Sequence, residues 1–299
     1  MANVPLVSLK AGAKLPKIGY GNGTALFKSD STTLVEGALK AGFTLIDTAE
    51  MYENSGYVGE ALKSSKHETQ VIAKIGTLSK IKQVAVEERK LLGKDRLNVL
   101  LLHLPPRGLD GLPSNVEAWK QMQELKDEGV ADIIGVSNWL KSDIEDVIKT
   151  NPKHPIQINQ IEHHPLLAGS QKQQKLLAYQ REQGIASTIY GALTPITEKP
   201  EESKNLLSVL EAIAKQESGW SPATVLFKWA SQTTKHGNSA DEEGIIITTG
   251  KKTERYPGYL SLFNSRPLTD EEVKKVSDAG SQAGVHKVRM LKYFDGRDE

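Results

Sequence analysis

Four side chains of the sequence could together perform acid–base chemistry. Asp47 ends a short apolar run, Tyr52 follows it, and Lys74 and His103 each end a later apolar run. A phenol has an ordinary pKa near 10, but a nearby ammonium group stabilises the phenolate and lowers that pKa. We therefore expect Lys74 to lower the pKa of Tyr52, and Asp47 to keep Lys74 charged and oriented.

A phenol of this kind could donate a proton to a carbonyl oxygen. His103 could donate a second hydrogen bond that orients the carbonyl and stabilises the negative charge developing on its oxygen. This combination suits the addition of hydride to an aldehyde or ketone. Each residue also has a simpler explanation, because Asp47 could cap a helix, Tyr52 could pack, and Lys74 and His103 could be ordinary strand-end or core residues.

Parallel strands could bring these four residues together. Short aliphatic or β-branched runs recur at residues 17–21, 44–47, 71–74, 99–103, 133–137, 157–160, 186–190 and 244–248. Amphipathic segments lie between them, at residues 31–41, 56–64, 80–92, 115–128, 141–150, 170–183 and 205–235, the last interrupted at 219–222. Apolar strands alternating with helices are typical of a parallel sheet covered on both faces. We predict an α/β fold, a (β/α)8 TIM barrel, with the strand-end residues gathered at one mouth.

The main alternative is an open doubly wound sheet. That fold usually has a glycine-rich phosphate turn after its first strand, and GYGNG at residues 19–23 matches G-x-G-x-x-G poorly. Residues 4–9 and 13–16 predict an N-terminal β-hairpin. Residues 268–284 predict an extra C-terminal helix, opened by a capping box of Thr269 and Glu272. Because no low-complexity linker divides the chain, we expect residues 1–299 to form a single domain.

Composition excludes several other classes of protein. The 38 basic and 37 acidic residues nearly cancel, so the charge gives no sign of a nucleic-acid partner or an anionic membrane. The absence of cysteine excludes disulfides and thiol nucleophiles, and it fits a reducing compartment. No apolar run approaches the roughly 20 residues that span a bilayer, and the start of the chain does not resemble a signal peptide. We expect a cytoplasmic protein, a monomer or weak homodimer, without a membrane partner.

A metal site is not expected either. The adjacent His163 and His164 would point in different directions from a strand, and no spacing of further carboxylates or histidines completes a site around them.

Four segments of the chain resemble a known family. They are GFTLIDTAEMYENSGYVGEAL at residues 42–62, DRLNVLLLHLP at 95–105, AWKQMQELKDEGVADIIGVSNW at 118–139 and IQINQIEHHPLL at 156–167. In order and spacing they resemble the aldo-keto reductases over essentially the whole chain. The resemblance implies an NADP-dependent oxidoreductase that reduces aldehydes or ketones to alcohols. It also implies a catalytic tetrad of Asp47, Tyr52, Lys74 and His103, with Tyr52 as the proton donor.

The resemblance further implies an NADPH/NADP+ cofactor that lies extended across the barrel mouth. Ser137, Asn138 and Gln160 would hold the nicotinamide carboxamide, and Tyr190 would stack on the ring. Asp47 and Thr24 are further candidate cofactor-binding residues, Thr24 for the ribose.

The adenosine end of the cofactor would lie along residues 245–264. Arg255 should face the 2′-phosphate and stack on the adenine, which favours NADPH over NADH because a guanidinium pairs well with a phosphate dianion. The usual lysine–serine pair of the family falls here at Thr249 and Gly250, and the basic residues are Lys251 and Lys252 instead. The ligands of the 2′-phosphate and of the adenine therefore stay open among Thr249, Lys251, Lys252 and Arg255.

The candidate substrate pocket contains Phe27, Met51, Leu104 and Trp139 besides Tyr52 and His103. Leu104 stands where many relatives have tryptophan, so we expect a less aromatic pocket. GYGNGTALF at residues 19–27 and TTGKKTER at 248–255 resemble fungal branches of the family. Those branches reduce conjugated polyketones, ketopantoyl lactone or α-keto esters and amides, and we expect a small carbonyl substrate of this kind.

Two other readings remain open at this point. The chain could be a barrel that binds NADPH without catalysis and acts as a sensor. It could also be an aldolase in which Lys74 forms a Schiff base with the substrate.

Overall fold

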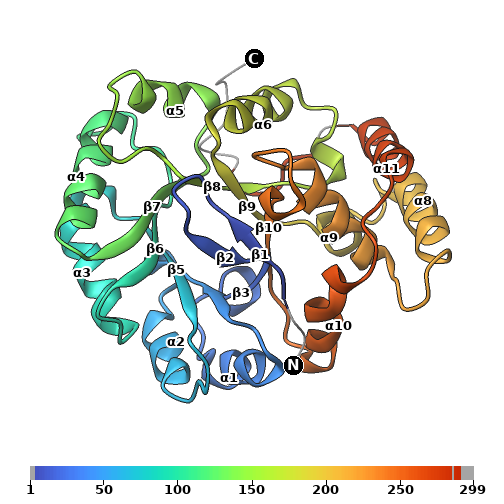
Figure 1. Cartoon of the computed structure of the whole chain (residues 1–299), viewed down its shortest axis with the longest axis horizontal. Helices are drawn as coiled ribbons and strands as arrows, with labels where there is room; N and C mark the ends of the chain where they lie inside the picture. The colour runs from blue at the N-terminus through green and yellow to red at the C-terminus, as the bar shows by residue number, and fades with distance from the viewer. Residues whose placement is uncertain (1–3, 285, 291–299) are drawn as a thin grey trace.

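Eight parallel strands form a closed barrel, as predicted, in the order β3-β4-β5-β6-β7-β8-β9-β10 with β10 paired to β3 (Figure 1). The computed structural model describes residues 4–284 and 286–290 of the chain. The barrel strands are β3 (Ile18–Gly21), β4 (Leu45–Asp47), β5 (Gln70–Ile75), β6 (Leu97–Leu102), β7 (Ala131–Ser137), β8 (Ile158–Glu162), β9 (Ala186–Tyr190) and β10 (Ile245–Thr248).

Helices surround the barrel (Figure 1). They are α1 (Thr32–Ala41), α2 (Ser55–Leu62), α3 (Ile81–Leu91), α4 (Asn115–Asp127), α5 (Lys141–Ile148), α6 (Gln171–Gln183), α7 (Thr194–Thr197), α8 (Lys204–Ala214), α9 (Pro222–Thr233), α10 (Tyr256–Ser261) and α11 (Asp270–Gln282). The amphipathic segment 205–235 is two helices, α8 and α9. The second begins at Pro222, where the Ser221 side chain accepts a hydrogen bond from the Thr224 backbone N–H. The capping box of Thr269 and Glu272 opens α11 as predicted.

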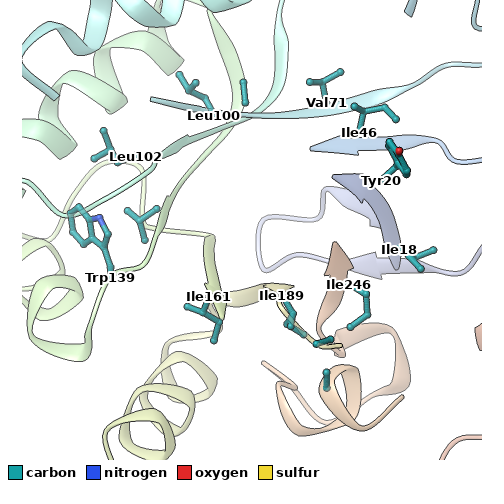
Figure 2. Packing of buried hydrophobic residues seen from close by; sticks show 14 of the residues in the cluster. Ile18, Tyr20, Ile46, Val71, Leu100, Leu102, Trp139, Ile161, Ile189 and Ile246 are labelled. Carbon is teal, nitrogen blue, oxygen red and sulfur yellow. The ribbon is translucent and has the colours of Figure 1, made fainter. Parts of the chain in front are cut away.

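The two-residue period of each strand divides its side chains between the helices and the barrel interior. Ile46, Leu100, Ile161, Ile189 and Ile246 point outward and join the core beneath the helices (Figure 2). Their neighbours point inward and form a second apolar cluster, which includes Leu45, Ile72, Val99, Leu101, Ile158 and Ile247. The barrel is therefore a filled core with an apolar centre.

The N-terminal hairpin closes one end of this interior. Its strands β1 (Leu6–Ser8) and β2 (Lys14–Pro16) pair antiparallel and lie across the barrel in Figure 1. Val7, Leu9 and Leu15 are buried in the inner cluster with the barrel residues. The hairpin meets the N-terminal ends of the strands, where the Gln70 side chain donates to the Lys14 carbonyl. The opposite, C-terminal end of the barrel stays open.

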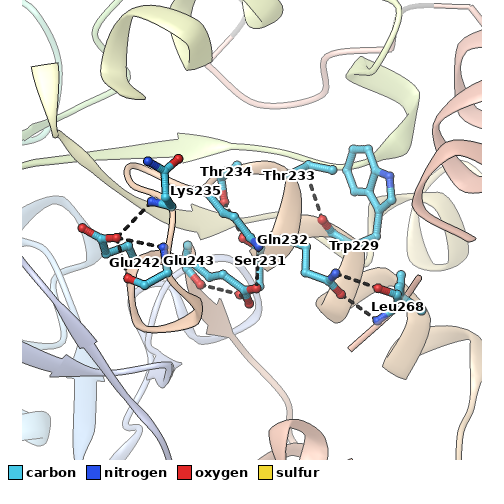
Figure 3. Close-up of polar contacts among 12 residues, drawn as sticks. Trp229, Ser231, Gln232, Thr233, Thr234, Lys235, Glu242, Glu243 and Leu268 are labelled. Carbon is cyan, nitrogen blue, oxygen red and sulfur yellow. Dashed lines mark hydrogen bonds and ion pairs between the residues drawn. The ribbon is translucent and has the colours of Figure 1, made fainter. Parts of the chain in front are cut away.

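Buried polar contacts hold the seam where β10 meets β3. Lys17, just before β3, donates to Glu243, just before β10, at 2.6 Å. Glu243 also pairs with Lys235 at 3.3 Å, and the Ser231 hydroxyl donates to the Gly244 carbonyl at 2.8 Å (Figure 3). These contacts fix the start of β10 relative to β3 and thereby complete the barrel.

The same strand period carries polar residues to the open end. Leu45 is followed two positions later by Asp47, Ile72 by Lys74, and Leu101 by His103. Each pair faces the interior, so the apolar layer lies deep and the polar layer lies at the mouth.

Strand β3 places no inward side chain at the mouth. A Cβ atom at Gly19 would lie 2.9 Å from Leu45 Cγ, and one at Gly21 would lie 2.9 Å from both Ile247 Cγ2 and Thr249 Oγ1. Glycine is therefore required at these positions, and it leaves space beside Asp47. In the described part of the chain, no helix is long and apolar enough to cross a membrane.

Candidate active site

A cavity of about 650 Å³ opens at the C-terminal ends of the strands. Its wall includes most of the polar residues that the sequence placed at strand ends, among them Asp47, Tyr52, His103, Asn138, Gln160 and Tyr190. These side chains come from different strands and loops, and only the closed barrel brings them together.

Asp47 and Lys74 form a fully buried ion pair. Lys74 Nζ donates to Asp47 Oδ1 at 2.6 Å, and Gln160 Nε2 donates to Asp47 Oδ2 at 2.7 Å. Burial lowers the pKa of Lys74, while the carboxylate of Asp47 opposes that effect. Asp47 therefore holds and orients Lys74, as the sequence predicted.

Tyr52 lies at the end of a short 3-10 helix, η2 (Glu50–Tyr52), that follows β4. Its ring contacts the His103 ring edge-on, with centroids 5.6 Å apart, and Lys74 Nζ lies 5.1 Å from its centroid. A Cβ at Gly23 would lie 2.9 Å from Tyr52 Cζ, so glycine there allows the loop after β3 to pack against the phenol.

Glu50, a residue that the sequence analysis missed, fixes η2 in place. Glu50 Oε2 accepts hydrogen bonds from the Gly76 and Thr77 backbone N–H groups, each at 2.8 Å. The Thr77 hydroxyl donates to the other carboxylate oxygen. This carboxylate ties η2 to the loop after β5, so Tyr52 and Lys74 are positioned by the same pair of neighbouring strands.

The pKa of Tyr52 shifts in the direction opposite to the one expected. Burial raises this pKa well above its ordinary value, the Asp47 carboxylate raises it further, and the Arg289 guanidinium opposes both. Lys74, whose ammonium charge is paired with Asp47, does not offset this rise. Tyr52 is therefore protonated at neutral pH and can act as a hydrogen-bond donor to a ligand.

His103 is a neutral imidazole. Burial and the nearby Lys74 charge lower its pKa to about 3. Within the described structure its Nδ1 is buried without a hydrogen-bond partner. Its backbone carbonyl accepts from Asn138 Nδ2 at 3.0 Å, which links the end of β6 to the loop after β7. A neutral imidazole beside the phenol can donate one hydrogen bond to a ligand.

Amide and hydroxyl groups line the neighbouring side of the mouth. Asn138 adopts a left-handed backbone conformation, with φ +62°, and its backbone N–H donates to the Gln160 carbonyl at 2.9 Å. The Ser137 hydroxyl donates to the same carbonyl at 3.0 Å, and the Tyr190 hydroxyl donates to Asn138 Oδ1 at 2.6 Å. These groups can both donate and accept hydrogen bonds, as a ligand carboxamide requires.

The other end of the cavity reaches the loops after β3 and β10. Thr24 and Thr249 line it, and Thr249 Oγ1 donates to the Gly21 carbonyl at 2.9 Å. Beyond Thr249, the basic residues Lys251, Lys252 and Arg255 are all exposed. These basic residues follow the cavity residue Thr249 closely in the sequence, an arrangement that fits a long ligand with a phosphorylated end.

Of the four predicted substrate residues, Phe27 lines the cavity of the described structure and the other three do not. Phe27 lines the cavity and is 44% exposed at its rim. Met51 packs instead over Gly76, where a Cβ would lie 2.2 Å from its Cγ. Leu104 and Trp139 are buried in the core beneath the helices, outside the lining of this cavity in the described structure. Figure 2 shows Trp139 in that core.

Residues beyond the predicted set also reach the mouth. Strand β8 continues two residues past Gln160, so Glu162 faces the same way and is buried. Arg289 and Met290, from the segment after α11, line the cavity as well. The alternation of IQINQIE could have identified Glu162, whereas segment 286–290 has no periodic pattern that places it.

The fold and the site define a barrel oxidoreductase that acts on carbonyl groups. A model of the aldo/keto reductase family matches residues 17–280, and the chain therefore belongs to the aldo/keto reductase family. As a member, it is an NAD(P)-dependent enzyme. Within the described residues, no group of three or more histidine or acidic side chains is placed to hold a metal ion.

Known proteins resemble the chain over most of its length. It is 32% identical to an NAD/NADP-dependent indole-3-acetaldehyde reductase of Schizosaccharomyces pombe, over 95% of this chain and 98% of that protein. It is 29% identical to an NADPH-dependent alpha-keto amide reductase of Saccharomyces cerevisiae, over 91% and 90%. A crystal structure of an aldo/keto reductase from Brucella melitensis covers 93% of this chain and all of that one, with 27% identity and a TM-score of 0.75. These two reductases are from fungi, which is consistent with the resemblance in the loop sequences.

Proposed function

We propose that the protein reduces small aldehydes or ketones to alcohols with NADPH, and that Tyr52 is the proton donor. The observation that carries this proposal is the pairing of a protonated phenol with a neutral imidazole at one cavity. Tyr52 and His103 both line the cavity, and their rings are 5.6 Å apart between centroids. A carbonyl oxygen between the two could accept a hydrogen bond from each.

Each residue of the tetrad has a separate role in this proposal. When bound, the reduced nicotinamide supplies the hydride that forms the new C–H bond. Tyr52 transfers its hydroxyl proton to the carbonyl oxygen as negative charge develops there, and His103 stabilises that charge by a hydrogen bond. Lys74 stabilises the resulting phenolate, and Asp47 keeps Lys74 charged.

The residues present fit the nicotinamide cofactor. Ser137, Asn138 and Gln160 would hold the carboxamide, Tyr190 would lie against the ring, and Asp47 and Thr24 would contact the ribose. Asp47, Asn138, Gln160, Tyr190 and Thr24 support this assignment because they all line one cavity. At the far end we propose Thr249, Lys251, Lys252 and Arg255 for the adenosine 2′-phosphate, since Thr249 lines the cavity and the three basic residues that follow it in the chain are exposed.

For the substrate we propose α-keto esters and amides, ketopantoyl lactone or conjugated polyketones. The similarity to an alpha-keto amide reductase supports this class. The cavity wall beside Phe27 contains Ala25, Ala192 and Leu193, which give a mostly aliphatic surface for such compounds.

The Schiff-base alternative is less compatible with the site. An aldolase lysine must reach its substrate, but Lys74 is fully buried, donates to Asp47, and is not part of the cavity wall of the described structure.

The decisive variant is Tyr52→Phe. We expect its kcat to fall by about 10²–10⁴-fold, the usual contribution of a positioned general acid, while the Kd for NADPH stays unchanged. The measurement is NADPH oxidation with a panel of aldehydes, α-keto lactones and diketones, together with a fluorescence titration of NADPH. Tight NADPH binding by the wild type without oxidation of the cofactor would instead indicate a sensor barrel. Full activity of the variant would exclude Tyr52 as the donor.

A further inference from the structure

The segment that follows α11 is fixed to the barrel mouth by one buried carboxylate. Glu162 Oε1 accepts from the Val288 backbone N–H and Oε2 accepts from the Arg289 backbone N–H, each at 3.0 Å. His164 Nε2 lies 3.2 Å from Oε1, and Lys287 Nζ lies 3.3 Å from Oε2. The successive backbone N–H groups of Val288 and Arg289 thus bind the carboxylate of Glu162.

This attachment stabilises the charged form of Glu162 although its side chain is inaccessible to solvent. Burial opposes ionisation, but His164, Lys287 and the Arg289 backbone together hold the pKa of Glu162 below its ordinary value. A carboxylate with four such partners fixes the backbone at Arg289 firmly. Glu162 therefore fixes the backbone position from which the Arg289 side chain extends.

From that position the Arg289 side chain lines the same cavity as Tyr52 and His103. Tyr190 lines this cavity too, and the charge of Arg289 opposes the upward pKa shift of both phenols. The guanidinium is paired with Glu198, which also lines the cavity and is about one-third exposed. A guanidinium can hold a carboxylate by two parallel hydrogen bonds, and a partly exposed Glu198 can turn to water when a ligand carboxylate replaces it.

We propose that Arg289 recognises substrates that carry a carboxylate near the reducible carbonyl, and that Glu162 is the residue that positions it. The inference rests on the proposed function, because the carbonyl is taken to bind at Tyr52 and His103. Arg289 would thus select among carbonyl compounds, while the tetrad would perform the reduction.

The test compares substrates that differ only in charge. Two matched pairs are suitable: phenylglyoxylate with its methyl ester, and 4-carboxybenzaldehyde with its methyl ester. The measured quantity is the ratio of kcat/KM for the acid to kcat/KM for the ester, with NADPH saturating. For Arg289→Gln we expect this ratio to fall by about 10–100-fold for at least one pair, through a higher KM for the acid, because charge-assisted hydrogen bonds contribute about 1.5–3 kcal/mol.

Glu198→Gln separates recognition from a merely structural ion pair. If Arg289 binds the substrate, removal of the competing carboxylate should raise the acid-to-ester ratio by a few-fold, opposite in sign to Arg289→Gln. If the pair is only structural, both variants should reduce activity on acid and ester alike. Arg96→Gln is the matched control, since it removes an exposed arginine charge beside Asp132, before the start of β6.

Glu162→Gln tests the positioning role. We expect a higher KM for the acids with nearly unchanged KM for the esters, whereas equal losses on both would assign Glu162 to stability alone. An unchanged ratio in Arg289→Gln, or a higher KM for NADPH instead, overturns the recognition role. If the wild type reduces neither acid nor ester, the proposed function itself is wrong. Reduction of the esters alongside an unchanged ratio rejects only this inference.

Discussion

At the scale of single residues, Asp47 controls the charges of the mouth. It accepts from Lys74 and Gln160 through different carboxylate oxygens. A buried ammonium without a partner would be strongly destabilising, so this pairing keeps Lys74 charged where burial alone favours the neutral amine. Tyr52 stays protonated beside this pair, because burial and the Asp47 carboxylate both raise its pKa.

The neutrality of His103 predicts the pH dependence of turnover. Because burial and Lys74 lower its pKa to about 3, the imidazole stays neutral as pH falls from 8 to 5. We expect kcat/KM to show no loss with a midpoint near 6.5, the ordinary histidine pKa. The measurement is a pH profile with a neutral carbonyl substrate. A midpoint near 6.5 that disappears in His103→Asn would contradict the assignment.

Residue types at strand ends could be predicted from the sequence, and loop orientations could not. Lys74 and His103 follow inward apolar residues by two or four positions, so the strand period places them at the mouth. Met51 and Tyr52 are consecutive in η2, yet Met51 packs over Gly76 while Tyr52 faces the cavity. That difference depends on Glu50 binding the loop after β5, a contact between two loops that no periodicity reveals.

At the scale of elements, a buried carboxyl on α3 joins that helix to α2. The Ser55 hydroxyl, at the start of α2, donates to Glu88 Oε2 at 2.6 Å. Burial raises the pKa of Glu88 to about 7, and the hydrogen bond and the more distant Lys74 oppose this only in part. The folded protein therefore favours the neutral carboxyl at this contact.

This pKa makes stability depend on pH with a definite sign. Between the ordinary glutamate pKa of 4.5 and about 7 the folded state binds more protons than the unfolded state, so stability falls as pH rises. We expect Glu88 to contribute a decrease of up to about 3 kcal/mol over this range, at about 1.4 kcal/mol per pKa unit. Urea unfolding of Glu88→Gln at pH 4.5, 6 and 7.5 should show a shallower decrease than the wild type. The exposed Glu211→Gln, on α8, should retain the wild-type slope, and an unaltered slope in Glu88→Gln would refute the raised pKa.

The order of the elements followed from the sequence, but the path of the last segment did not. Alternating strands and helices predicted the barrel because each strand is apolar and each helix amphipathic. The segment 286–290 is short and has neither pattern, and its position depends on hydrogen bonds to Glu162, more than 120 residues earlier. Contacts of a buried side chain with the backbone of a distant segment leave no signal in local composition.

At the scale of the whole molecule, the hairpin completes the core of the barrel. Leu15 is fully buried among the inward strand residues, whereas Leu6 on the partner strand is 48% exposed. The barrel would otherwise expose its apolar centre to water at the N-terminal ends of the strands. The hairpin and the candidate active site thus lie at opposite ends of one interior.

We expect Leu15→Ala to lower the free energy of unfolding by about 2–5 kcal/mol, the usual cost of a large-to-small change in a core. Leu6→Ala is the matched control on the same hairpin and should change it by less than about 0.5 kcal/mol. Denaturant unfolding measures both variants, and kcat/KM of the folded Leu15→Ala protein should equal that of the wild type. A similar loss of stability in both variants would show that the hairpin does not act as a plug.

Because the hairpin closes one end of the barrel, ligands enter and leave the described cavity at the opposite end, the mouth. Asp47 and Gln160 are buried in the wall of the cavity, whereas Phe27, which lines the same cavity, is 44% exposed. Because the hairpin fills the far end, we expect a ligand held by the deeper groups to bind before, and to leave after, a ligand held nearer the rim.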